Sequence, residues 1–375
     1  MKIETECVHG GKYIDKATRG VNTPIFTSSS FEYLDREETV YPRYFNTPNQ
    51  NAVVQKMCVL EGAESGILFS SGMAAISTAV LALAHSGDHV VMMDELYGGT
   101  HAFATAAFDQ FGIRYSFAAT DADAVVQAIL PQTKIVVLES PTNPLLSVLD
   151  IRRVAEAAKE KGVLTIIDNT FASPVNQNPI QMGVDVVVHS GTKYMGGHGD
   201  LCCGIALASA ALTERIRATA LYLGGSLNAI SCYLLERSLK TLALRVERQS
   251  SNAFAIASFL AAHKSVRKVN YPGLPGFPGY EIARAQMKGF GGMLSFELDS
   301  SVLPPQRFLR NLKLITPAVS LGGVETIICS PADTSHSKVS AEERKRIGIS
   351  DSLLRLSVGI ENVEDLLSDL EQALR

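Results

Sequence analysis

Four apolar runs in the sequence are each followed at once by residues that can do chemistry. The runs, each long enough for one buried strand, are residues 89–93, 134–139, 163–167 and 184–188. The segments that follow them bring an aromatic ring, an amide, a carboxylate, two hydroxyls and an amine: Tyr97, Asn143, Asp168, Ser190, Thr192 and Lys193. In an open parallel sheet the carboxyl ends of the strands share one edge, where ligands bind. We therefore predict that these side chains meet in one site.

This set of side chains has what pyridoxal 5′-phosphate (PLP) requires. PLP needs a lysine for its imine and an acid beside its pyridine nitrogen. It also needs donors for its phosphate, and the N-terminus of a helix provides them. Gly72 and Met73, at the start of a predicted helix over residues 73–85, supply that feature. The sequence therefore predicts a PLP site in which Lys193 is the Schiff-base lysine.

Each of these residues alone has an ordinary structural interpretation. A lysine after a strand is usually a solvated loop residue, Asp168 alone fits a helix cap, and Tyr97 alone fits a packed surface aromatic. The prediction therefore rests on their combination at the ends of consecutive strands. No GxGxxG segment follows a predicted strand and no GxxxxGK[ST] segment occurs, which argues against a nucleotide site.

The cysteines do not predict a metal site. Cys202 and Cys203 lie near His198 and His189 in the sequence, but their spacing matches no common zinc pattern. The six cysteines include no CxxC pair, and free thiols are typical of a reducing cytoplasm. The first eleven residues do not resemble a secretory signal. We therefore expect a cytoplasmic protein without a metal.

Charge and hydropathy exclude several classes of partner. The formal net charge is −4, whereas a nucleic-acid or anionic-membrane partner favours a clustered positive surface. No uninterrupted apolar run approaches the roughly 20 residues that span a bilayer. We expect a small-molecule ligand, with no nucleic acid and no membrane as partner.

The elements around the candidate site predict an α/β fold. Apolar strands that alternate with helices indicate a mostly parallel sheet covered on both faces. Asp150 is a predicted cap for one of these helices, and a long helical stretch is predicted over residues 228–263. A smaller α/β unit follows, with strands near residues 293–298 and 353–358 and with Asn362 capping a final helix.

The length of 375 residues exceeds what one hydrophobic core usually holds. We divide the chain into an extended N-terminal arm (1–50), a large PLP-binding domain (51–245) and a small C-terminal domain (246–375). The arm contains many turn-forming residues and no strong helical period. Such an arm needs a surface to pack on, and we expect that surface on a neighbouring subunit.

From residue 4 to residue 374 the sequence resembles the cystathionine γ-lyase, cystathionine γ-synthase and methionine γ-lyase family of fold-type I PLP enzymes. The matching segments are Ser-Gly-Met-Ala at 71–74, Tyr-Gly-Gly-Thr at 97–100, Glu-Ser-Pro-Thr-Asn-Pro at 139–144, Asp-Asn-Thr-Phe at 168–171, Thr-Lys-Tyr at 192–194, Gly-His-Gly-Asp at 197–200, Ser-Leu-Gly-Gly at 320–323 and Arg-Leu-Ser-Val-Gly at 355–359.

The resemblance implies a role for each cofactor-binding residue. Lys193 would bind PLP covalently and move protons, while Asp168 would keep the ring nitrogen protonated. Tyr97 would stack on the ring and handle a proton at the leaving group, and Asn143 would sit near the phenolic oxygen. The phosphate would be bound by the amides of two residues and the hydroxyls of two others: Gly72, Met73, Ser190 and Thr192.

The resemblance also implies how substrate and subunits are arranged. Arg355 would bind the substrate carboxylate, a bidentate task that suits a guanidinium, and Ser320 would lie near the substrate. Tyr41 and Arg43 would reach the phosphate of a neighbouring subunit. The active unit would then be at least a dimer, and the family resemblance implies a homotetramer formed as a dimer of dimers.

The sequence departs from the family pattern at five places, one of which is Asn46-Thr47-Pro48 where the family usually has Asn-Pro-Thr. Val40 and Val319 stand where some members carry acids for the substrate's distal amine, and Ala102 replaces a common arginine. Gly99 stands where methionine-degrading members typically have cysteine. The missing charges imply that cystathionine is held differently or is not preferred, and the missing cysteine argues against a dedicated methionine lyase.

We therefore expect a carbon–sulfur lyase acting on cystathionine or a related sulfur amino acid. It would release a thiol, ammonia and a 2-oxo acid by β- or γ-elimination. The main alternative is a γ-replacement synthase of the cystathionine γ-synthase or O-acylhomoserine sulfhydrylase type. Transamination also stays open, because fold does not determine function. A non-catalytic PLP binder or a structural oligomer would not require Lys193, Asp168 and the polar strand ends, all of which are present.

Overall fold

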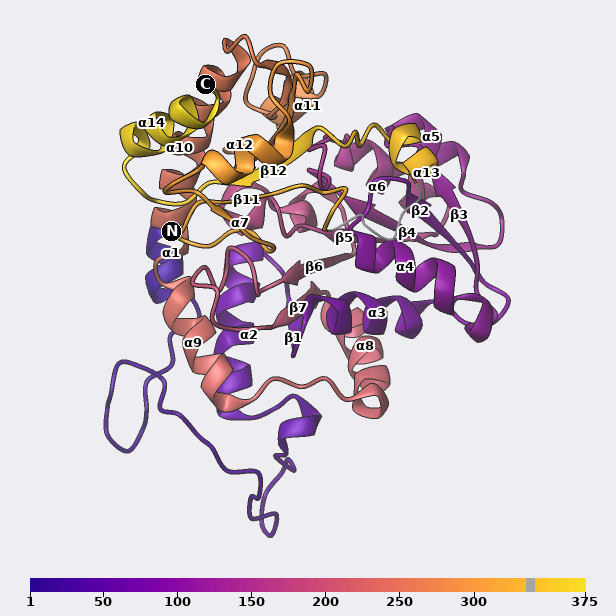
Figure 1. The fold of residues 1–375 in the computed structure, drawn as a ribbon. Coiled ribbons are helices and arrows are strands. Elements are labelled where there is room, and N and C mark those ends of the chain that lie inside the picture. Colours follow the sequence, from indigo (N-terminus) through magenta and orange to yellow (C-terminus); the bar gives the residue numbers. More distant parts are fainter. Residues whose placement is uncertain (335–340) are drawn as a thin grey trace.

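A seven-stranded sheet forms the centre of the larger part of the computed structural model, which describes residues 1–334 and 341–375 (Figure 1). Its strand order is β1-β7-β6-β5-β4-β2-β3. The bounds are β1 (Ser65–Phe69), β2 (His89–Met93), β3 (Arg114–Ala118), β4 (Thr133–Glu139), β5 (Leu164–Asp168), β6 (Val186–Ser190) and β7 (Gly204–Ala208). The strands from β2 to β6 run parallel, while β7 is antiparallel to both of its neighbours. The predicted α/β class is thus confirmed.

The central strands are mostly apolar because helices cover both faces of the sheet. The alternation within β6 shows this directly, since neighbouring residues of a strand point to opposite faces. His189 contacts Glu61 of α2, whereas Ser190 lies against Gly72 of α3. The predicted strands are confirmed within a residue or two, and Asp150 caps α6 as predicted by accepting a hydrogen bond from the Arg153 amide at 3.1 Å.

The helices of the described chain follow the same α/β pattern up to α8. Their bounds are α1 (Ile3–His9), α2 (Pro48–Glu61), α3 (Gly72–Leu83), α4 (Gly98–Ala107), α5 (Ala122–Gln127), α6 (Ile151–Glu160), α7 (Ser173–Asn176), α8 (Ala210–Leu223), α9 (Ala229–Leu239), α10 (Leu242–Ala261), α11 (Tyr280–Gln286), α12 (Pro305–Asn311), α13 (Ala341–Arg346) and α14 (Val363–Ala373). Short 3₁₀ helices are η1 (Pro42–Tyr44), η2 (Asp109–Phe111) and η3 (Pro179–Met182).

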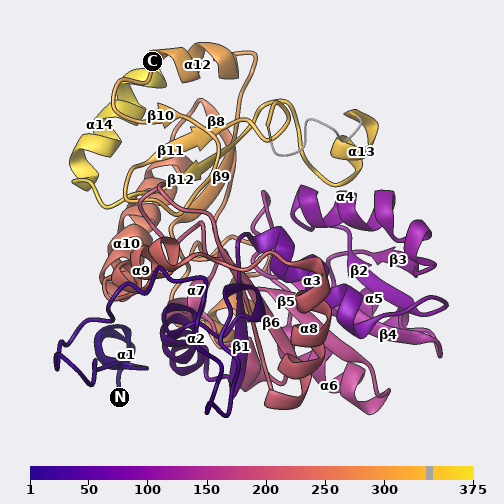
Figure 2. The same ribbon diagram turned by 90° about the horizontal axis from the view of Figure 1, so that it is seen from below.

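A second sheet of five strands follows in the described C-terminal part, in the order β10-β11-β12-β9-β8. Its bounds are β8 (Val266–Asn270), β9 (Met293–Leu298), β10 (Thr316–Pro317), β11 (Ile327–Cys329) and β12 (Leu353–Ser357). Figures 1 and 2 both show α14 on the side of this sheet away from the larger sheet. The predicted cap is present, because the Asn362 side chain accepts a hydrogen bond from the Glu364 amide at 2.8 Å.

Helix α10 connects the two packing units. Leu242, Ala243 and Val246 pack in a core with the larger sheet, while Ile256 and Leu260 pack in the core of the smaller sheet. The predicted single helical stretch over residues 228–263 is wrong in one respect, because it consists of α9 and α10 with a break between them. The division at residue 245 falls inside α10 and stays a prediction.

The N-terminal arm differs from the prediction at its beginning. Ile3–His9 form α1, which packs on α2 and α10, so the arm is not extended throughout. The residues between α1 and η1 form a long loop that projects from the body of the molecule (Figure 1). Most of their side chains are exposed or half-buried. Turn-forming residues explain the loop, whereas the short helical period of α1 is too brief to stand out in the sequence.

Candidate active site

A cleft with a volume of about 1030 Å³ lies at the carboxyl ends of the parallel strands. Its walls come from the strand ends of the larger sheet, from the N-termini of α3 and α4, and from segments of the C-terminal part. The predicted site residues that line it are Gly72, Met73, Tyr97, Asn143, Asp168, Ser190, Thr192, Lys193, Ser320 and Arg355. The structure therefore brings the predicted cofactor and substrate residues together, with the exception of Tyr41 and Arg43.

Lys193 lies in the turn that follows β6, and its amine is positioned by a residue from the C-terminal part of the chain. Its Nζ atom donates a hydrogen bond to the Oγ atom of Ser320 at 2.8 Å. Burial, followed by the charge of Arg355, lowers the pKa of the lysine amine. A lysine that loses its proton more readily is a better nucleophile for a carbonyl, which is what covalent attachment of a cofactor aldehyde requires.

Asp168 is the last residue of β5, and one of its carboxylate oxygens accepts hydrogen bonds from Thr170. The Oδ1 atom accepts hydrogen bonds from the Thr170 amide at 3.0 Å and from the Thr170 hydroxyl at 2.5 Å. Desolvation raises the pKa of this half-buried carboxyl, so Asp168 gains from a positive partner. A protonated ring nitrogen is such a partner. The residues present therefore fit the pyridine end of PLP.

The phosphate end of the site is built by the close approach of α3 to β6. A Cβ atom added to Gly72 would lie 2.8 Å from the Cβ atom of Ser190, so only glycine permits this approach. Ser71 caps α3 by accepting a hydrogen bond from the Ala74 amide at 3.0 Å. The Thr192 hydroxyl donates to the Cys203 carbonyl at 3.2 Å. The first amides of a helix beside two hydroxyls are suited to a phosphate group.

Arg355 of β12 is arranged to bind a carboxylate. Its Nη1 atom donates to the Oδ1 atom of Asn143 at 2.9 Å, and its Nη2 atom donates to the Ser320 carbonyl at 2.8 Å. Its Nε atom is buried and has no hydrogen-bond partner among the described residues. A buried donor without a partner is costly. A substrate carboxylate in the cleft would satisfy it.

Tyr97 forms one wall of the cleft, and Gly99 leaves room for its ring. A Cβ atom added to Gly99 would lie 2.5 Å from the Cε1 atom of Tyr97 and 2.9 Å from the Sδ atom of Met73. Tyr97 is half-exposed in the cleft and directly precedes α4. The observed position of its ring therefore requires glycine at residue 99.

Sequence reasoning missed several residues that line the same cleft. Glu139 lies in a motif that was recognised, but no role was assigned to it. Residues of α4, of the turn before β7 and of the C-terminal part complete the lining: His101, Thr105, Cys202, Cys329, Asp333 and Thr334. Position at the carboxyl end of a predicted strand was the signal available for Glu139. The others carry no motif, because tertiary packing alone places them in the cleft.

Tyr41 and Arg43 lie outside the cleft of their own chain. Arg43 is in η1, where its Nη1 atom donates to the Leu221 carbonyl at 2.7 Å and its guanidinium lies over the rings of Tyr41 and Tyr44. Tyr41 is half-exposed. Their contribution to a neighbouring subunit stays a prediction.

The cysteines and histidines considered for a metal have other contacts. The His189 Nε2 atom lies 2.9 Å from Glu61 Oε2, and the His198 Nδ1 atom lies 2.7 Å from the Gly196 carbonyl oxygen. Within residues 1–334 and 341–375, no group of three His, Cys, Asp or Glu residues is placed to hold a metal ion. None of the described helices is long and apolar enough to cross a membrane.

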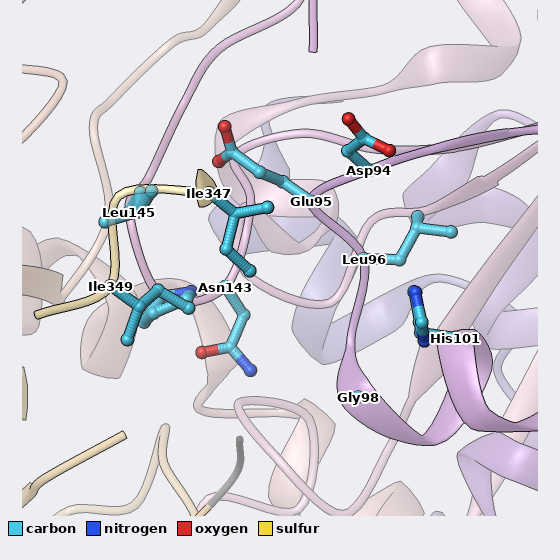
Figure 3. A pocket seen from close by; sticks show the side chains of 10 residues that line it. Asp94, Glu95, Leu96, Gly98, His101, Asn143, Leu145, Ile347 and Ile349 are labelled. Atoms are coloured by element: carbon cyan, nitrogen blue, oxygen red, sulfur yellow. The ribbon is translucent and has the colours of Figure 1, made fainter. Parts of the chain in front are cut away.

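A much smaller cavity of about 20 Å³ adjoins the cleft (Figure 3). It shares Asn143 with the cleft, and its apolar lining includes Leu145, Ile347 and Ile349. A cavity of this size holds about one water molecule. It marks the contact between the C-terminal segment and the strand ends of the larger sheet.

Comparisons with known proteins agree with this geometry. The family profile described as Cys/Met metabolism PLP-dependent enzyme matches residues 4–375. A cystathionine gamma-lyase of Bacillus subtilis (strain 168) is 44% identical, over 100% of this chain and 99% of the relative. A cystathionine beta-lyase of Lactococcus lactis subsp. cremoris (strain MG1363) is 43% identical, over 99% and 98%. The crystal structure of cystathionine gamma synthase from Xanthomonas oryzae pv. oryzae in complex with aminoacrylate and cysteine is 38% identical, with a TM-score of 0.95 over 100% of this chain and 98% of that chain.

Proposed function

Because this chain belongs to the Cys/Met metabolism PLP-dependent enzyme family, we propose that it is a carbon–sulfur lyase acting on cystathionine or a related thioether amino acid. The observation that carries the proposal is the contact of Lys193 and Arg355 with the same serine. Lys193 Nζ donates to the Ser320 hydroxyl at 2.8 Å, and Arg355 Nη2 donates to the Ser320 carbonyl at 2.8 Å. A cofactor-binding amine thus lies beside a carboxylate clamp, as an amino-acid substrate requires.

The side chains of the cleft divide the chemistry among them. Bound PLP supplies an electron-withdrawing ring that acidifies the Cα–H bond of the substrate. Arg355 holds the substrate carboxylate, and Asp168 holds the proton on the ring nitrogen. The amine of Lys193 would hold the cofactor and would serve as the general base for the Cα proton. Tyr97 lies on the wall of the cleft, from which it donates a proton to the departing thiolate.

The outer part of the cleft bears on which substrate is accepted. Ala102 and Val319 line it, so the positions at which some family members carry charges are apolar here. Gly99 stands where methionine-degrading members typically have cysteine, which argues against a dedicated methionine lyase. These features favour a thioether substrate whose distal part is held without the usual charged contacts.

The main alternative is a γ-replacement synthase, which the similarity to the Xanthomonas structure supports. Such an enzyme needs the same Lys193, Asp168 and Arg355, and differs in having a thiol replace the leaving group of an O-acylated homoserine. The two functions therefore share a cofactor site. They differ because the synthase takes up a thiol as a second substrate, whereas the lyase does not.

We also propose a homotetramer formed as a dimer of dimers, located in the cytoplasm. The position of Arg43 away from its own cleft supports exchange of the N-terminal arm between subunits. Tyr222 and Leu223, which directly follow Leu221, are large exposed apolar residues, as expected of a surface covered by another subunit. All six cysteines are free, which fits a reducing compartment.

The experiment that tests the proposed reaction supplies the PLP-loaded enzyme with one substrate at a time: cystathionine, methionine, cysteine or an O-acylated homoserine. Cystathionine β-elimination releases homocysteine, pyruvate and ammonia, whereas γ-elimination releases cysteine, 2-oxobutanoate and ammonia. Either set of products supports the lyase. Ester consumption that requires an added thiol supports the synthase, and formation of a keto acid without thiol or ammonia would indicate transamination.

A further inference from the structure

We propose that Glu139 is a positioning residue whose single carboxylate holds two walls of the cofactor site in place. Its Oε2 atom accepts a hydrogen bond from the Tyr97 amide at 2.7 Å, and its Oε1 atom accepts one from the Asn143 amide at 2.9 Å. Tyr97 and Asn143 are 46 residues apart in the sequence, and this carboxylate joins their two loops through the backbone amides of both residues. The inference rests on the proposed cofactor site and is the same for the lyase and the synthase.

The fold places Glu139 at the floor of the cleft. Glu139 is the last residue of β4, and its register partner in the neighbouring parallel strand β5 is Asp168. Residues in register on parallel strands point to the same face of the sheet. Both side chains accordingly line the cleft. Glu139 is only 4% exposed, so its bonds are not shared with bulk water.

Burial makes this carboxylate unfavourable unless it is fully hydrogen-bonded. Burial and the neighbouring charge of Asp168 raise the pKa of Glu139, and its bonds to the two amides act in the opposite direction. Tyr97 is also the residue that precedes α4, where the helix dipole favours a negative group. The hydrogen bonds from the two amides therefore offset the cost of burying the carboxylate. The carboxylate in turn restrains the backbones of Tyr97 and Asn143.

The restraint extends from Asn143 to the substrate clamp. The amide nitrogen of Asn143 donates to Glu139, while its side-chain Oδ1 atom accepts from Arg355 Nη1 at 2.9 Å. Movement of residue 143 would therefore move a partner of Arg355. Movement of residue 97 would displace the ring that faces the cofactor. Small displacements of this kind, about 1 Å, can lower a rate by about 100-fold.

Glu95 provides a matched control within the same pair of loops. Its Oε2 atom accepts from the Thr142 hydroxyl at 2.7 Å and from the Ser147 hydroxyl at 2.8 Å, so it also joins the two loops. Glu95 lines the small cavity but does not belong to the residues that line the cleft. In Figure 3 the carboxylate of Glu95 and the side-chain amide of Asn143 point in different directions. Its loss perturbs loop packing without a direct contact to the site.

The test compares Glu139→Gln, Glu139→Asp and Glu95→Gln as PLP-loaded enzymes. A glutamine side chain at this position would offer one acceptor and would place an NH₂ group against the second amide, while aspartate keeps the charge but is one methylene too short. For both variants we expect a changed visible circular dichroism of the bound cofactor, weaker PLP binding and a 10- to 100-fold lower kcat/KM. Glu95→Gln should retain the wild-type spectrum and kcat/KM. The spectrum and PLP affinity are measured without substrate, so they test the inference even if the proposed reaction is wrong.

Two results would overturn the inference. The first is a folded Glu139→Gln or Glu139→Asp enzyme with a wild-type spectrum and wild-type kcat/KM, even if its melting temperature is lower. The second is failure of both variants to fold, because the carboxylate would then serve folding rather than the site. An Asn143→Ala background adds a further check. If Glu139 acts partly through Asn143, the effects of the two substitutions on kcat/KM will be less than additive.

Discussion

The Nζ atom of Lys193 donates a hydrogen bond to the Oγ atom of Ser320 at 2.8 Å, across 127 residues of sequence. Lys193 follows a strand of the larger sheet, whereas Ser320 precedes the smaller sheet's strand β11. The reactive amine is therefore positioned only when the two parts of the chain are packed together. The backbone of Ser320 has a φ of 84°, a left-handed conformation that serine seldom adopts, so its hydroxyl is held at some conformational cost.

Removal of Lys193 should abolish both the bound-cofactor signal and the activity. In Lys193→Ala no amine remains for covalent attachment or for proton transfer at Cα. We expect the visible absorption band of attached PLP to disappear and turnover to fall at least about 1,000-fold, within the usual contribution of a general base. Lys134→Ala, which removes an exposed lysine of β4, is the control. A Lys193→Ala enzyme with the wild-type absorption band would contradict the assignment.

Two substitutions at Ser320 should separate its hydroxyl from its backbone conformation. Ser320→Ala removes the partner of Lys193 and keeps the strained backbone, while Ser320→Gly removes the same hydroxyl and relieves the strain. A net hydrogen bond contributes about 1 kcal/mol, so we expect both variants to lose about five- to tenfold in kcat. Ser320→Gly should melt at a higher temperature than Ser320→Ala. Unchanged kcat in both variants would show that the hydroxyl does not position the amine.

Arg355→Lys should weaken substrate binding more than it slows the chemical step. Lysine keeps the charge but cannot reproduce the planar set of donors that contacts Asn143, Ser320 and a substrate carboxylate. We expect KM to rise about 10- to 100-fold, and kcat to fall less. The control is Arg267→Lys, in an exposed ion pair with Asp299. Steady-state kinetics with whichever of the four test substrates is turned over provide the measurement, and an unchanged KM would contradict a contact between Arg355 and the substrate carboxylate.

Arg245→Met should lower stability through the loop that carries Lys193. The buried guanidinium of Arg245 donates to the carbonyls of Tyr194, Met195 and Ser238, and burial lowers its pKa to about 10. Methionine leaves these carbonyls without their donor, so we expect a loss of about 3 kcal/mol in the free energy of unfolding. Urea denaturation measures the loss. Arg248→Met, an exposed change on the same helix, should have almost no effect.

The cofactor-free protein should become more stable as pH rises through the range in which Lys193 titrates. The folded-state pKa of Lys193 lies below the ordinary 10.5. Between these two pKa values the unfolded chain binds a proton that the folded chain does not. The stability contribution therefore rises with pH and is smallest below the lowered pKa. As the pH rises toward 10.5, we expect the urea midpoint of the wild-type protein to rise more than that of Lys193→Met. Equal pH dependence of the two proteins would contradict the lowered pKa.

The parallel strands and their polar ends were predictable because each strand is a short apolar run next to a turn. The ends of β4, β5 and β6 carry Asn143, Asp168 and Lys193, and parallel topology alone brings such ends together. The edge strand β3 was missed because Arg114–Ala118 contains exposed and polar positions. Strand β1 was missed because it is stabilised by antiparallel pairing with β7, far away in sequence.

The rest of the site depends on packing that has no local signal. Asp333 and Thr334 reach the cleft only because the smaller sheet lies against the larger one. Glu139 was visible as a strand end, but its bonds to Tyr97 and Asn143 depend on where two loops meet. Across the break between α9 and α10, Arg245 of α10 donates a hydrogen bond to the Ser238 carbonyl of α9 at 3.0 Å.

The separation of Arg43 from its own cleft has a genetic consequence. If the arms are exchanged as proposed, an active site is assembled from Lys193 of one subunit and Arg43 of another. Two inactive alleles, Lys193→Ala and Arg43→Ala, would then complement each other when expressed in the same cell. A mixed dimer would contain one site with both defects and one site with neither. Two alleles that both alter Lys193 would not complement.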